Sequence, residues 1–313
     1  MRALRKIICI ASTLGLLAVN STYALIVYGT TNEDAEVKYD ASSNAAHCSV
    51  VTTSSNCSAV YLGNGWFITA NHVSLAVNST VRQNGNYATI TQIDTTLNTS
   101  YGADLKLFHV EDTSTLEDLE AINLSTEIYS KIQGTGMLGD QLIRGSELTL
   151  VGAGYGREED SDLYATTVVA DKRRGTIRYG TATTLSQNLQ IEVNGVTYST
   201  FATVAEARDG ATSALTGDSG GGMFFEYAGD FYLVGLITWV SPETAAETIV
   251  FGQIVDEFEK ETNYSHTLAI NLRDYLPQIS EITGVSIPEP AHYALIISIL
   301  GLCGILATKT RGK

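Results

Sequence analysis

Short β-prone runs separated by turn residues make up most of the body of this 313-residue chain. Branched and aromatic residues dominate four of these runs, at 66–68, 105–108, 148–151 and 231–239. Such residues are enriched in strands, whereas a clear helical spacing of apolar residues stands out at Leu268, Leu272 and Leu276, close to the end of the body. Many short strands with turns between them favour antiparallel β-structure over a parallel α/β sheet, so we expect an all-β fold.

The glycine-rich stretch 216–222, which reads Thr-Gly-Asp-Ser-Gly-Gly-Gly, concentrates a carboxylate and a hydroxyl among glycines. Glycine permits tight turns and close backbone approaches, so Ser219 can project its hydroxyl while neighbouring N–H groups point at one spot. Acyl transfer needs both a nucleophile and donors for the oxyanion. A glycine-rich hairpin turn without chemistry is the alternative interpretation of so short a pattern.

Two further candidate catalytic residues, His72 and Asp104, adjoin predicted strands. His72 follows the run at 66–68 and the small residues after it, and Asp104 directly precedes a run of alternating apolar residues. An aspartate at the head of a buried strand can lie against an imidazole N–H, fix its tautomer and stabilise the imidazolium. Each residue taken alone is better explained as an ordinary surface or core residue, so a catalytic role is indicated only by their order along the chain together with the serine motif.

The order His72, Asp104, Ser219 discriminates between two types of hydrolase. The Gly-x-Ser-x-Gly pattern also fits the nucleophile elbow of an α/β-hydrolase, in which the acid and the histidine follow the serine. Asp256 and His266 are the residues available for those roles. The chain before Ser219 lacks the alternation of strands and helices that this fold requires, so we favour the order in which the histidine comes first.

Four segments resemble motifs of the trypsin/chymotrypsin-like serine protease family, and the resemblance spans roughly 26–282. They are Ala70-Asn71-His72, Asp104-Leu105-Lys106-Leu107, Gly217-Asp218-Ser219-Gly220-Gly221 and the strand at 231–239. The resemblance implies two antiparallel six-stranded β-barrels and a closing helix within 25–283, with the boundary between barrels near 140–147. It also implies that Ser219 is the nucleophile, His72 the general base and Asp104 its orienting acid. The N–H groups of Gly217 and Ser219 would form the oxyanion hole, with no cofactor or metal.

The resemblance further implies which residues bind the substrate. Ser213 occupies the position that floors the primary specificity pocket, and Thr238, Trp239 and Val240 would line the cleft. An uncharged floor offers no counter-charge for Lys or Arg, and valine in place of the family's glycine would narrow the mouth of the pocket. We therefore expect cleavage after small or medium apolar residues.

The resemblance assigns a role to the amino terminus as well. In the family, a new terminus of Ile-Val type inserts inward, and its ammonium pairs with the aspartate before the nucleophile; here Ile26 would meet Asp218. A signal-peptide cut after Ala24 leaves Leu25 in front of Ile26, so either a second cut follows or the pocket accepts Leu25. An ordinary apolar first strand is the alternative.

Two of the four cysteines, Cys48 and Cys57, lie in the body, whereas Cys9 and Cys303 lie in the apolar segments at the ends. Polar residues between two valine-bearing arms predict a β-hairpin whose strands the two cysteines could bridge, as expected for an exported protein. In the resembled family, a cysteine at the place of Cys57 pairs with one directly after the catalytic histidine. That position is Val73 here, which leaves Cys48 as the available partner.

The two ends of the chain are predicted to be targeting segments. Basic residues, an apolar run and small residues before Ala24 are typical of a signal peptide over 1–24. At the other end, a Pro-Glu-Pro sequence at 288–290, an apolar segment at 291–307 and a basic tail could form an ordinary membrane anchor. The segment 284–313 also resembles the PEP-CTERM sorting signal of Gram-negative bacteria. That resemblance implies transient anchoring, processing by an exosortase, and delivery to the cell surface or extracellular matrix.

The balance of charge limits the partners. Acidic residues outnumber basic ones by 34 to 19, which argues against nucleic acid and anionic membranes as partners because both attract Lys and Arg. The sequence therefore predicts an exported serine endopeptidase that acts on proteins or peptides and that is matured by signal peptidase. A catalytically silent surface or matrix binding protein on the same scaffold is the alternative.

Overall fold

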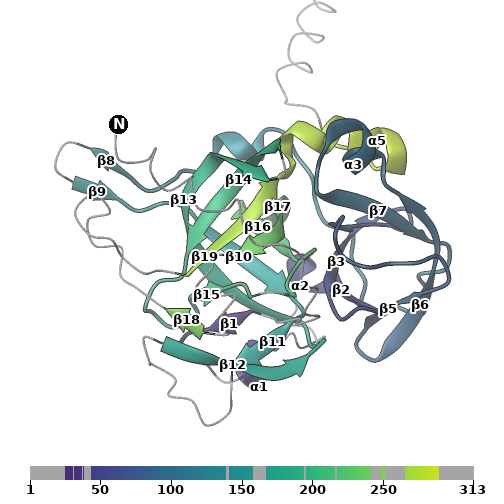
Figure 1. Ribbon diagram of the computed structural model, residues 1–313, viewed down its shortest axis with the longest axis horizontal. Helices are drawn as coiled ribbons and strands as arrows, with labels where there is room; N and C mark the ends of the chain where they lie inside the picture. Colours follow the sequence, from purple (N-terminus) through teal and green to yellow (C-terminus); the bar gives the residue numbers. More distant parts are fainter. Residues whose placement is uncertain are drawn as a thin grey trace, which may run out of the picture.

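The structure is a computed structural model that describes residues 25–30, 32–36, 38, 44–138, 141–157, 167–193, 195–215, 217–240, 248–250 and 265–288. These residues form an all-β protein built around two closed six-stranded antiparallel barrels and one short closing helix (Figure 1). The all-β class, the two barrels and a closing helix expected from the sequence are thereby confirmed. The helix lies later than the spacing of Leu268, Leu272 and Leu276 predicted, because Leu268 belongs to a strand (His266–Asn271), Leu272 begins a 3₁₀ turn and the helix itself is Leu276–Thr283.

The first barrel contains strands β2 to β7 and lies to the right in Figure 1. Its strands are β2 (Val50–Thr53), β3 (Ser58–Gly63), β4 (Trp66–Ala70), β5 (Thr80–Gln83), β6 (Asn86–Asp94) and β7 (Leu105–Val110). Around the barrel they follow the order β2-β3-β4-β7-β6-β5. Alternate residues point inward, and the rings of Phe67 and Phe108, on paired strands, stack with centroids 5.1 Å apart in the barrel core.

The second barrel follows the order β10-β13-β14-β19-β17-β16. Its strands are β10 (Glu147–Gly152), β13 (Arg178–Val193), β14 (Val196–Val204), β16 (Gly222–Tyr227), β17 (Asp230–Val240) and β19 (His266–Asn271). One large apolar cluster includes Leu105 and Leu107 of the first barrel together with Leu150, Phe224 and Leu236 of the second. The two barrels therefore share a continuous hydrophobic core across their seam.

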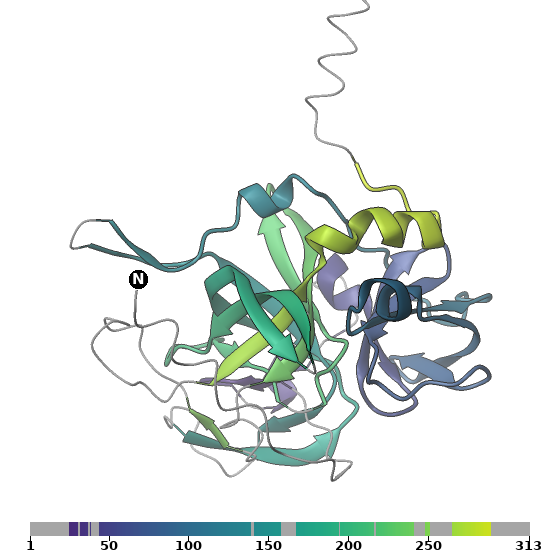
Figure 2. The same cartoon turned by 45° about the horizontal axis from the view of Figure 1, so that its top comes forward.

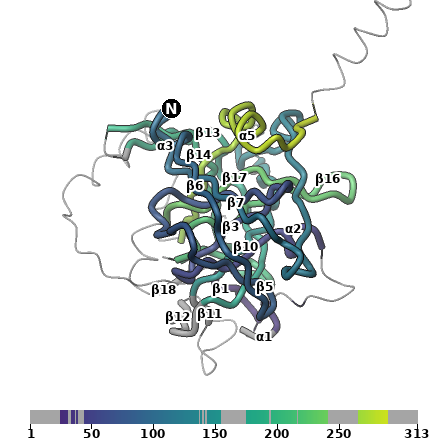
Figure 3. The backbone as a smooth tube through the Cα atoms, turned by 90° about the vertical axis from the view of Figure 1, so that its right-hand side faces the viewer, coloured from purple at the N-terminus to yellow at the C-terminus, as the bar shows by residue number. Residues whose placement is uncertain are grey.

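Smaller elements surround the barrels. They are β1 (Ile26–Val27) paired with β15 (Thr212–Ser213), β8 (Gly136–Leu138) with β9 (Gln141–Ile143), the sheet of β11 (Tyr155–Arg157), β12 (Thr167–Arg174) and β18 (Thr248–Val250), the helices α1 (Asn32–Ala35), α2 (Ala45–Cys48), α3 (Thr96–Tyr101) and α5 (Leu276–Thr283), and the 3₁₀ turns η2 (Ile128–Ser130) and η3 (Leu272–Tyr275). In the tube view of Figure 3, α5 lies at the top of the molecule, while α1, β11 and β12 lie at the bottom.

The closing helix α5 fastens the second barrel to the first. It leaves the end of β19 and runs over the first barrel, as Figure 2 shows. Leu276 and Ile279 are fully buried in the shared core, and the Asn64 amide of the β3–β4 turn donates to the carbonyl of Thr283 at 3.5 Å. The helix therefore helps to hold the seam between the barrels closed.

The expected disulfide between Cys48 and Cys57 is wrong, because no disulfide joins the two residues in the structure. The hairpin itself exists, but Cys57 lies opposite Thr53, at one end of β2, and Cys48 ends the helix before the other end. The four residues of β2 alone separate them by about 13 Å, whereas bridged Cα atoms lie about 4.4–6.8 Å apart. Burial, together with the charges of Glu120 and Asp118, raises the pKa of the Cys48 thiol to about 11, so this thiol is protonated at neutral pH.

The predicted targeting segments lie almost entirely outside the described residues. The structure does not describe the signal-peptide region 1–24. It also does not describe the sorting segment from 289 onward, which includes the apolar run at 291–307. Among the helices that the structure does describe, none has both the length and the apolar character needed to cross a bilayer.

Candidate active site

Strand pairing in the first barrel brings His72 and Asp104 together. In the antiparallel register of β4 and β7, Ala70 lies opposite Leu105, so the residues just after β4 meet those just before β7. The backbone N–H of Asn71 donates to the carbonyl of Asp104 at 3.1 Å, and the N–H of His72 donates to Oδ1 of Asp104 at 3.0 Å. The turn that carries the histidine is therefore fixed to the aspartate through the backbone as well as through the side chain.

Ser219 is presented by a tight glycine-rich turn between β15 and β16 of the second barrel. Gly217 and Gly220 have φ values of 105° and 82°, which favour glycine. A Cβ at Gly220 would lie 2.1 Å from both the Ser58 carbonyl oxygen and Thr69 Oγ1 of the first barrel. The N–H of Ser58 also donates to the carbonyl of Ser219 at 3.1 Å. The serine turn is thus pressed directly against the first barrel, across the seam.

The three candidate side chains form one hydrogen-bonded chain across the seam. Nδ1 of His72 lies 2.7 Å from Oδ2 of Asp104, and Nε2 lies 2.7 Å from Oγ of Ser219. Because a carboxylate can only accept, Nδ1 carries the proton, and Nε2 of the neutral ring is left to accept from the serine hydroxyl. The His72 side chain is 47% exposed and that of Asp104 only 14%, so the ring is open on one side while its partner is sheltered.

Two backbone donors beside Ser219 have no acceptor among the residues that the structure describes. No described residue accepts a hydrogen bond from the N–H of Gly217 or of Ser219. By contrast, the next two N–H groups are used within the second barrel: Gly220 donates to the Ile237 carbonyl at 2.8 Å, and Gly221 donates to the Asp218 carbonyl at 2.7 Å. The turn thus leaves two donors beside the serine hydroxyl for an outside acceptor.

Asp218, next to the serine, is fully buried. Its Oδ2 accepts from the N–H of Leu215 at 2.9 Å, and Oδ1 lies against Gly152, where a Cβ would come within 2.5 Å of it. Burial raises the pKa of this carboxyl well above its usual value. The N–H of Leu215, the positive charge of Arg178, and the backbone N–H groups of Leu25 and Gly154 partly oppose that rise.

The amino-terminal residues reach Asp218 in a register one position away from the expected one. Ile26 pairs with Ser213 in the β1–β15 ladder, and its carbonyl accepts from Oγ1 of Thr212 at 2.9 Å. The backbone N–H that lies beside Asp218 is that of Leu25, which is itself fully buried. The family pattern favoured Ile26, and the extra residue after Ala24 left open that the pocket accepts Leu25 instead.

The residues predicted to bind substrate lie along β15 and β17. Ser213 is fully buried in β15. Thr238 sits at a bulge where the pairing of β17 with β19 shifts between Ile237 and Trp239, and its Oγ1 has no hydrogen-bond partner among the described residues. Trp239 and Val240 are half-buried. A bulge of this kind re-aims the neighbouring side chains.

Trp239 forms an aromatic pair with Tyr198, which the sequence analysis missed. The ring of Tyr198, on β14, packs against the Trp239 indole with centroids 5.0 Å apart. Burial, together with the nearby carboxylate of Asp104, raises the pKa of the Tyr198 phenol. The two residues are far apart in the sequence and meet only because β19 lies between β14 and β17 in the barrel.

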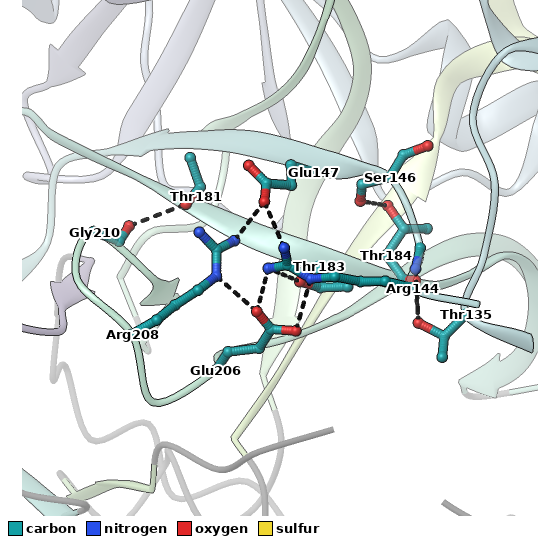
Figure 4. Close-up of polar contacts among 11 residues, drawn as sticks. Thr135, Arg144, Ser146, Glu147, Thr181, Thr183, Thr184, Glu206, Arg208 and Gly210 are labelled. Atoms are coloured by element: carbon teal, nitrogen blue, oxygen red, sulfur yellow. Dashed lines mark hydrogen bonds and ion pairs between the residues drawn. The ribbon is translucent and has the colours of Figure 1, made fainter. Parts of the chain in front are cut away.

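A network of two arginines and two glutamates, shown in Figure 4, fastens the loop before β15 to the start of β10. Nη1 of Arg144 and Nη2 of Arg208 both lie 3.0 Å from Oε1 of Glu147. Nε of Arg208 donates to Oε2 of Glu206 at 2.6 Å, and Arg144 binds the same carboxylate through Nε and Nη2. Glu206, whose side chain is 12% exposed, is the most buried member of the network.

The loop held by this network carries the amino-terminal strand. The backbone N–H of Tyr28 donates to the carbonyl of Ala211 at 2.8 Å, and the Tyr28 carbonyl accepts from the N–H of Gly210 at 2.9 Å. Ala211 directly precedes β15, the strand that pairs with β1 and contains Ser213. The network therefore supports the placement of Leu25 beside Asp218. It also supports the position of β15, the strand that precedes the serine turn.

Replacing Glu206 by glutamine is expected to lower the free energy of unfolding by about 1–2 kcal/mol, because two arginines lose one of the two carboxylates that they share. The full cost of a buried pair does not apply, since the two arginine side chains are 45% and 33% exposed and screened by solvent. The midpoint temperature of thermal unfolding at pH 7 would then fall by about 2–8 °C. Glu226→Gln, an exposed change on β16, is the matched control and should leave the unfolding temperature unchanged.

The same variant makes a prediction about pH. Burial alone would raise the pKa of Glu206, but the hydrogen bonds and charges of Arg144 and Arg208 outweigh it and lower that pKa below its usual value. A lowered folded-state pKa gives stability that is present above the unfolded pKa and lost as pH falls through the folded one. The difference between wild type and Glu206→Gln should therefore shrink below about pH 4. A difference that stays constant down to pH 3 would contradict an ionised Glu206.

The residues proposed for the alternative α/β-hydrolase order do not form a site among the described residues. Asp256 lies outside the described residues. His266 begins β19 and pairs with Val204 in the second barrel. The antiparallel barrels themselves contradict the parallel sheet of that fold.

Comparison with known proteins agrees with the two barrels. Residues 35–260, well over half of the chain, match the family model described as Trypsin. The curated proteins contain no significant match to this chain.

Proposed function

Because the chain belongs to the trypsin family, we propose that it is a serine endopeptidase that hydrolyses peptide bonds through Ser219, His72 and Asp104. The observation that most supports this proposal is the pair of 2.7 Å contacts that joins Asp104, His72 and Ser219 in one line. An ordinary structural histidine has no need of a serine hydroxyl on one ring nitrogen and a sheltered carboxylate on the other.

In the proposed mechanism, Oγ of Ser219 attacks the scissile carbonyl carbon while Nε2 of His72 takes the hydroxyl proton. The Asp104 carboxylate holds the ring in the required tautomer and stabilises the imidazolium. The new oxyanion accepts from the N–H groups of Gly217 and Ser219, which have no described acceptor of their own. The C–N bond then breaks as His72 gives its proton to the leaving amine, and water hydrolyses the acyl-enzyme by the same steps.

We infer a preference for small or medium apolar residues before the scissile bond. Ser213 supplies no negative charge for a basic side chain, and the branched Val240 stands where the family has glycine. Thr238, Trp239 and Val240 lie on β17 beyond the end of its pairing with β16, which stops at Leu236. That side of the strand is therefore suited to pairing with an extended peptide. Protein or peptide substrates are therefore proposed, without a cofactor.

Export and surface location form a second part of the proposal. It is supported by the sequence pattern of 1–24 and of 284–313. Signal peptidase would cut after Ala24, and an exosortase would process the carboxyl-terminal segment after transient anchoring through 291–307. The mature protein would then act at the cell surface or in the extracellular matrix of a Gram-negative bacterium.

A fluorophosphonate probe tests the catalytic proposal. An activated serine displaces fluoride from such a probe and forms an Oγ–P bond, whereas a serine without a base does not. The folded chain, processed at its amino terminus, should become labelled on the peptide that contains Ser219, and heat-denatured chain should not. Cleavage of a peptide library by the same material reports the residue preference. Failure of the folded, processed chain to label would favour the silent binding protein instead.

A further inference from the structure

Lys106 is a buried cation beside the catalytic histidine, and sequence reasoning passed over it. It lies on β7, two residues after Asp104, and is only 9% exposed. Because side chains alternate along a strand, Lys106 shares a face with Phe108 and Val110, which belong to the apolar core of the first barrel. A lysine in such a series was the available indication in the sequence, since lysine is almost never buried without a partner.

The partner of this ammonium is a backbone carbonyl, not a carboxylate. Nζ of Lys106 donates to the carbonyl oxygen of Val73 at 2.8 Å. No described carboxylate lies within ion-pair distance of it. Burial lowers the pKa of Lys106, and the nearby negative charge of Asp104 works against that decrease. Burying a cation to bind one carbonyl is costly compared with an apolar side chain of similar length, which suggests a specific use.

Val73 directly follows His72, so the contact acts on the turn that carries the imidazole. The near side of that turn is already held, because Asn71 and His72 donate to Asp104 and the N–H of Val73 donates to the carbonyl of Ala70 at 3.1 Å. Lys106 holds the segment that follows His72, through the Val73 carbonyl, where the chain leaves the active site. With both sides held, the ring has little freedom to move out of line between Asp104 and Ser219.

We propose that Lys106 is a positioning residue, which holds the Val73 carbonyl so that His72 stays in line with Ser219 and which places a positive charge beside the Asp104–His72 pair. The proposal rests on the proposed function for its catalytic consequences. A neighbouring cation opposes formation of the imidazolium. Removal of the charge should therefore make the imidazolium easier to form.

Groups from both barrels surround the Asp104–His72 pair. The charge of Asp104 acts on Lys106 of β7 and on the phenol of Tyr198, on β14 of the second barrel. The strands that pair with β7 place Thr69 of β4 opposite Lys106 and Asp94 of β6 opposite Leu107. The Asp94 carboxylate already accepts from the N–H of Thr96 at 2.8 Å, and Tyr101 on α3 is exposed. Among the described residues, Lys106 is therefore the cation that acts on the pair from within the first barrel.

Lys106→Met tests both parts of the proposal, because methionine fills the same space without a charge or a donor. We expect kcat on a peptide substrate to fall about 10–100-fold, with KM within about threefold of wild type, because a small misplacement of a catalytic group has effects of this size. We also expect the acid limb of the kcat/KM profile to move to higher pH. Loss of the charge alone would make the imidazolium easier to form, which shifts the acid limb but does not misplace the ring. The fall in kcat therefore measures the loss of positioning, and the shift of the acid limb measures the loss of the charge.

Two further variants keep the experiment decisive. Lys106→Arg retains the charge and a donor, so it should keep the acid limb near that of wild type and recover most of kcat. Lys131→Met, which removes an exposed lysine that directly follows η2 and lies over the Tyr227 ring, is the matched control and should change neither quantity. If Lys106→Met does not fold, Lys106→Gln, with a neutral donor, serves in its place. A folded, uncharged variant with wild-type kcat and an unmoved acid limb would overturn the proposal.

The proposal has a readout that does not need turnover. The Nδ1 proton of His72, in its 2.7 Å hydrogen bond to Asp104, should give a far-downfield proton resonance that is sharp in wild type and in Lys106→Arg and broadened in Lys106→Met. If wild type hydrolyses nothing but shows this difference, the proposed function fails and the role of Lys106 stands. If wild type hydrolyses peptides and the three resonances are identical, the role of Lys106 fails and the proposed function stands.

Discussion

Replacing Ser219 by alanine is expected to lower kcat on a peptide substrate by about 10⁶-fold and to abolish fluorophosphonate labelling. The change removes the oxygen atom that lies 2.7 Å from Nε2 of His72 and leaves the backbone of the turn in place. Whatever rate remains comes from substrate binding and from the two free N–H donors, which alanine does not alter. Initial rates, with thermal unfolding to show that the fold is intact, would measure the effect.

The effects of replacing the three side chains are expected not to be additive. His72→Ala should cost about as much as Ser219→Ala, and the double variant scarcely more, because each change alone already breaks the proton path. Asp104→Asn should cost about 10⁴-fold, since an amide at that position favours the wrong tautomer of the ring. Losses that multiply in the double variant would contradict a shared path. Ser114→Ala, in an exposed loop of the first barrel, should behave as wild type.

The convergence of these residues could be predicted because it depends on local features that the sequence shows directly. His72 follows the end of one strand and Asp104 precedes the start of another, and the β4–β7 register then brings those two ends together. The serine turn is marked by its glycines, two of which adopt positive φ angles. Strand runs in sufficient number likewise predicted the all-β class, although the count of strands in each barrel came from the resemblance to a family.

Features that depend on register and on distant contacts could not be predicted. The hairpin around Cys57 was expected, but which residue lies across from each cysteine depends on where the pairing begins, and the register places Thr53 opposite Cys57. The contact of Lys106 with Val73 and the pairing of Tyr198 with Trp239 join residues 33 positions apart or from separate strands. A pattern along the chain carries no information about such meetings until the fold is known.

Replacing Asp218 by asparagine is the second change for which we expect a large effect, a fall in kcat/KM of about 10²–10³-fold with the fold intact. Asparagine keeps the shape of the side chain and can still accept from the N–H of Leu215, which donates to Oδ2 at 2.9 Å. What it loses is the negative charge. In a fully buried position that charge needs a positive partner, and a cut after Ala24 would turn the backbone N–H of Leu25, already beside this carboxyl, into an ammonium.

The charge matters for catalysis because Asp218 lies between the two candidate oxyanion donors. Its backbone follows Gly217 and precedes Ser219, and its own N–H donates to the carbonyl of Leu215 at 3.1 Å. A side chain anchored to the amino terminus would hold the turn in the conformation that leaves both N–H groups directed outward. Without the anchor, the glycines on either side allow the turn to relax, which removes the donors and leaves the Ser219–His72 contact intact.

Comparing chains that differ only before Leu25 separates this account from a simple packing effect. A chain that begins at Leu25 should hydrolyse peptides about 10²–10³-fold faster than one that retains two residues in front of it, and the extension should have little further effect in Asp218→Asn. Asp230→Asn, at the exposed start of β17, controls for loss of surface charge. If the extended chain is fully active and Asp218→Asn is not, the charge of Arg178, which also acts on this carboxyl, sustains the turn without the terminus. If neither change affects the rate, the buried amino terminus has no part in activity.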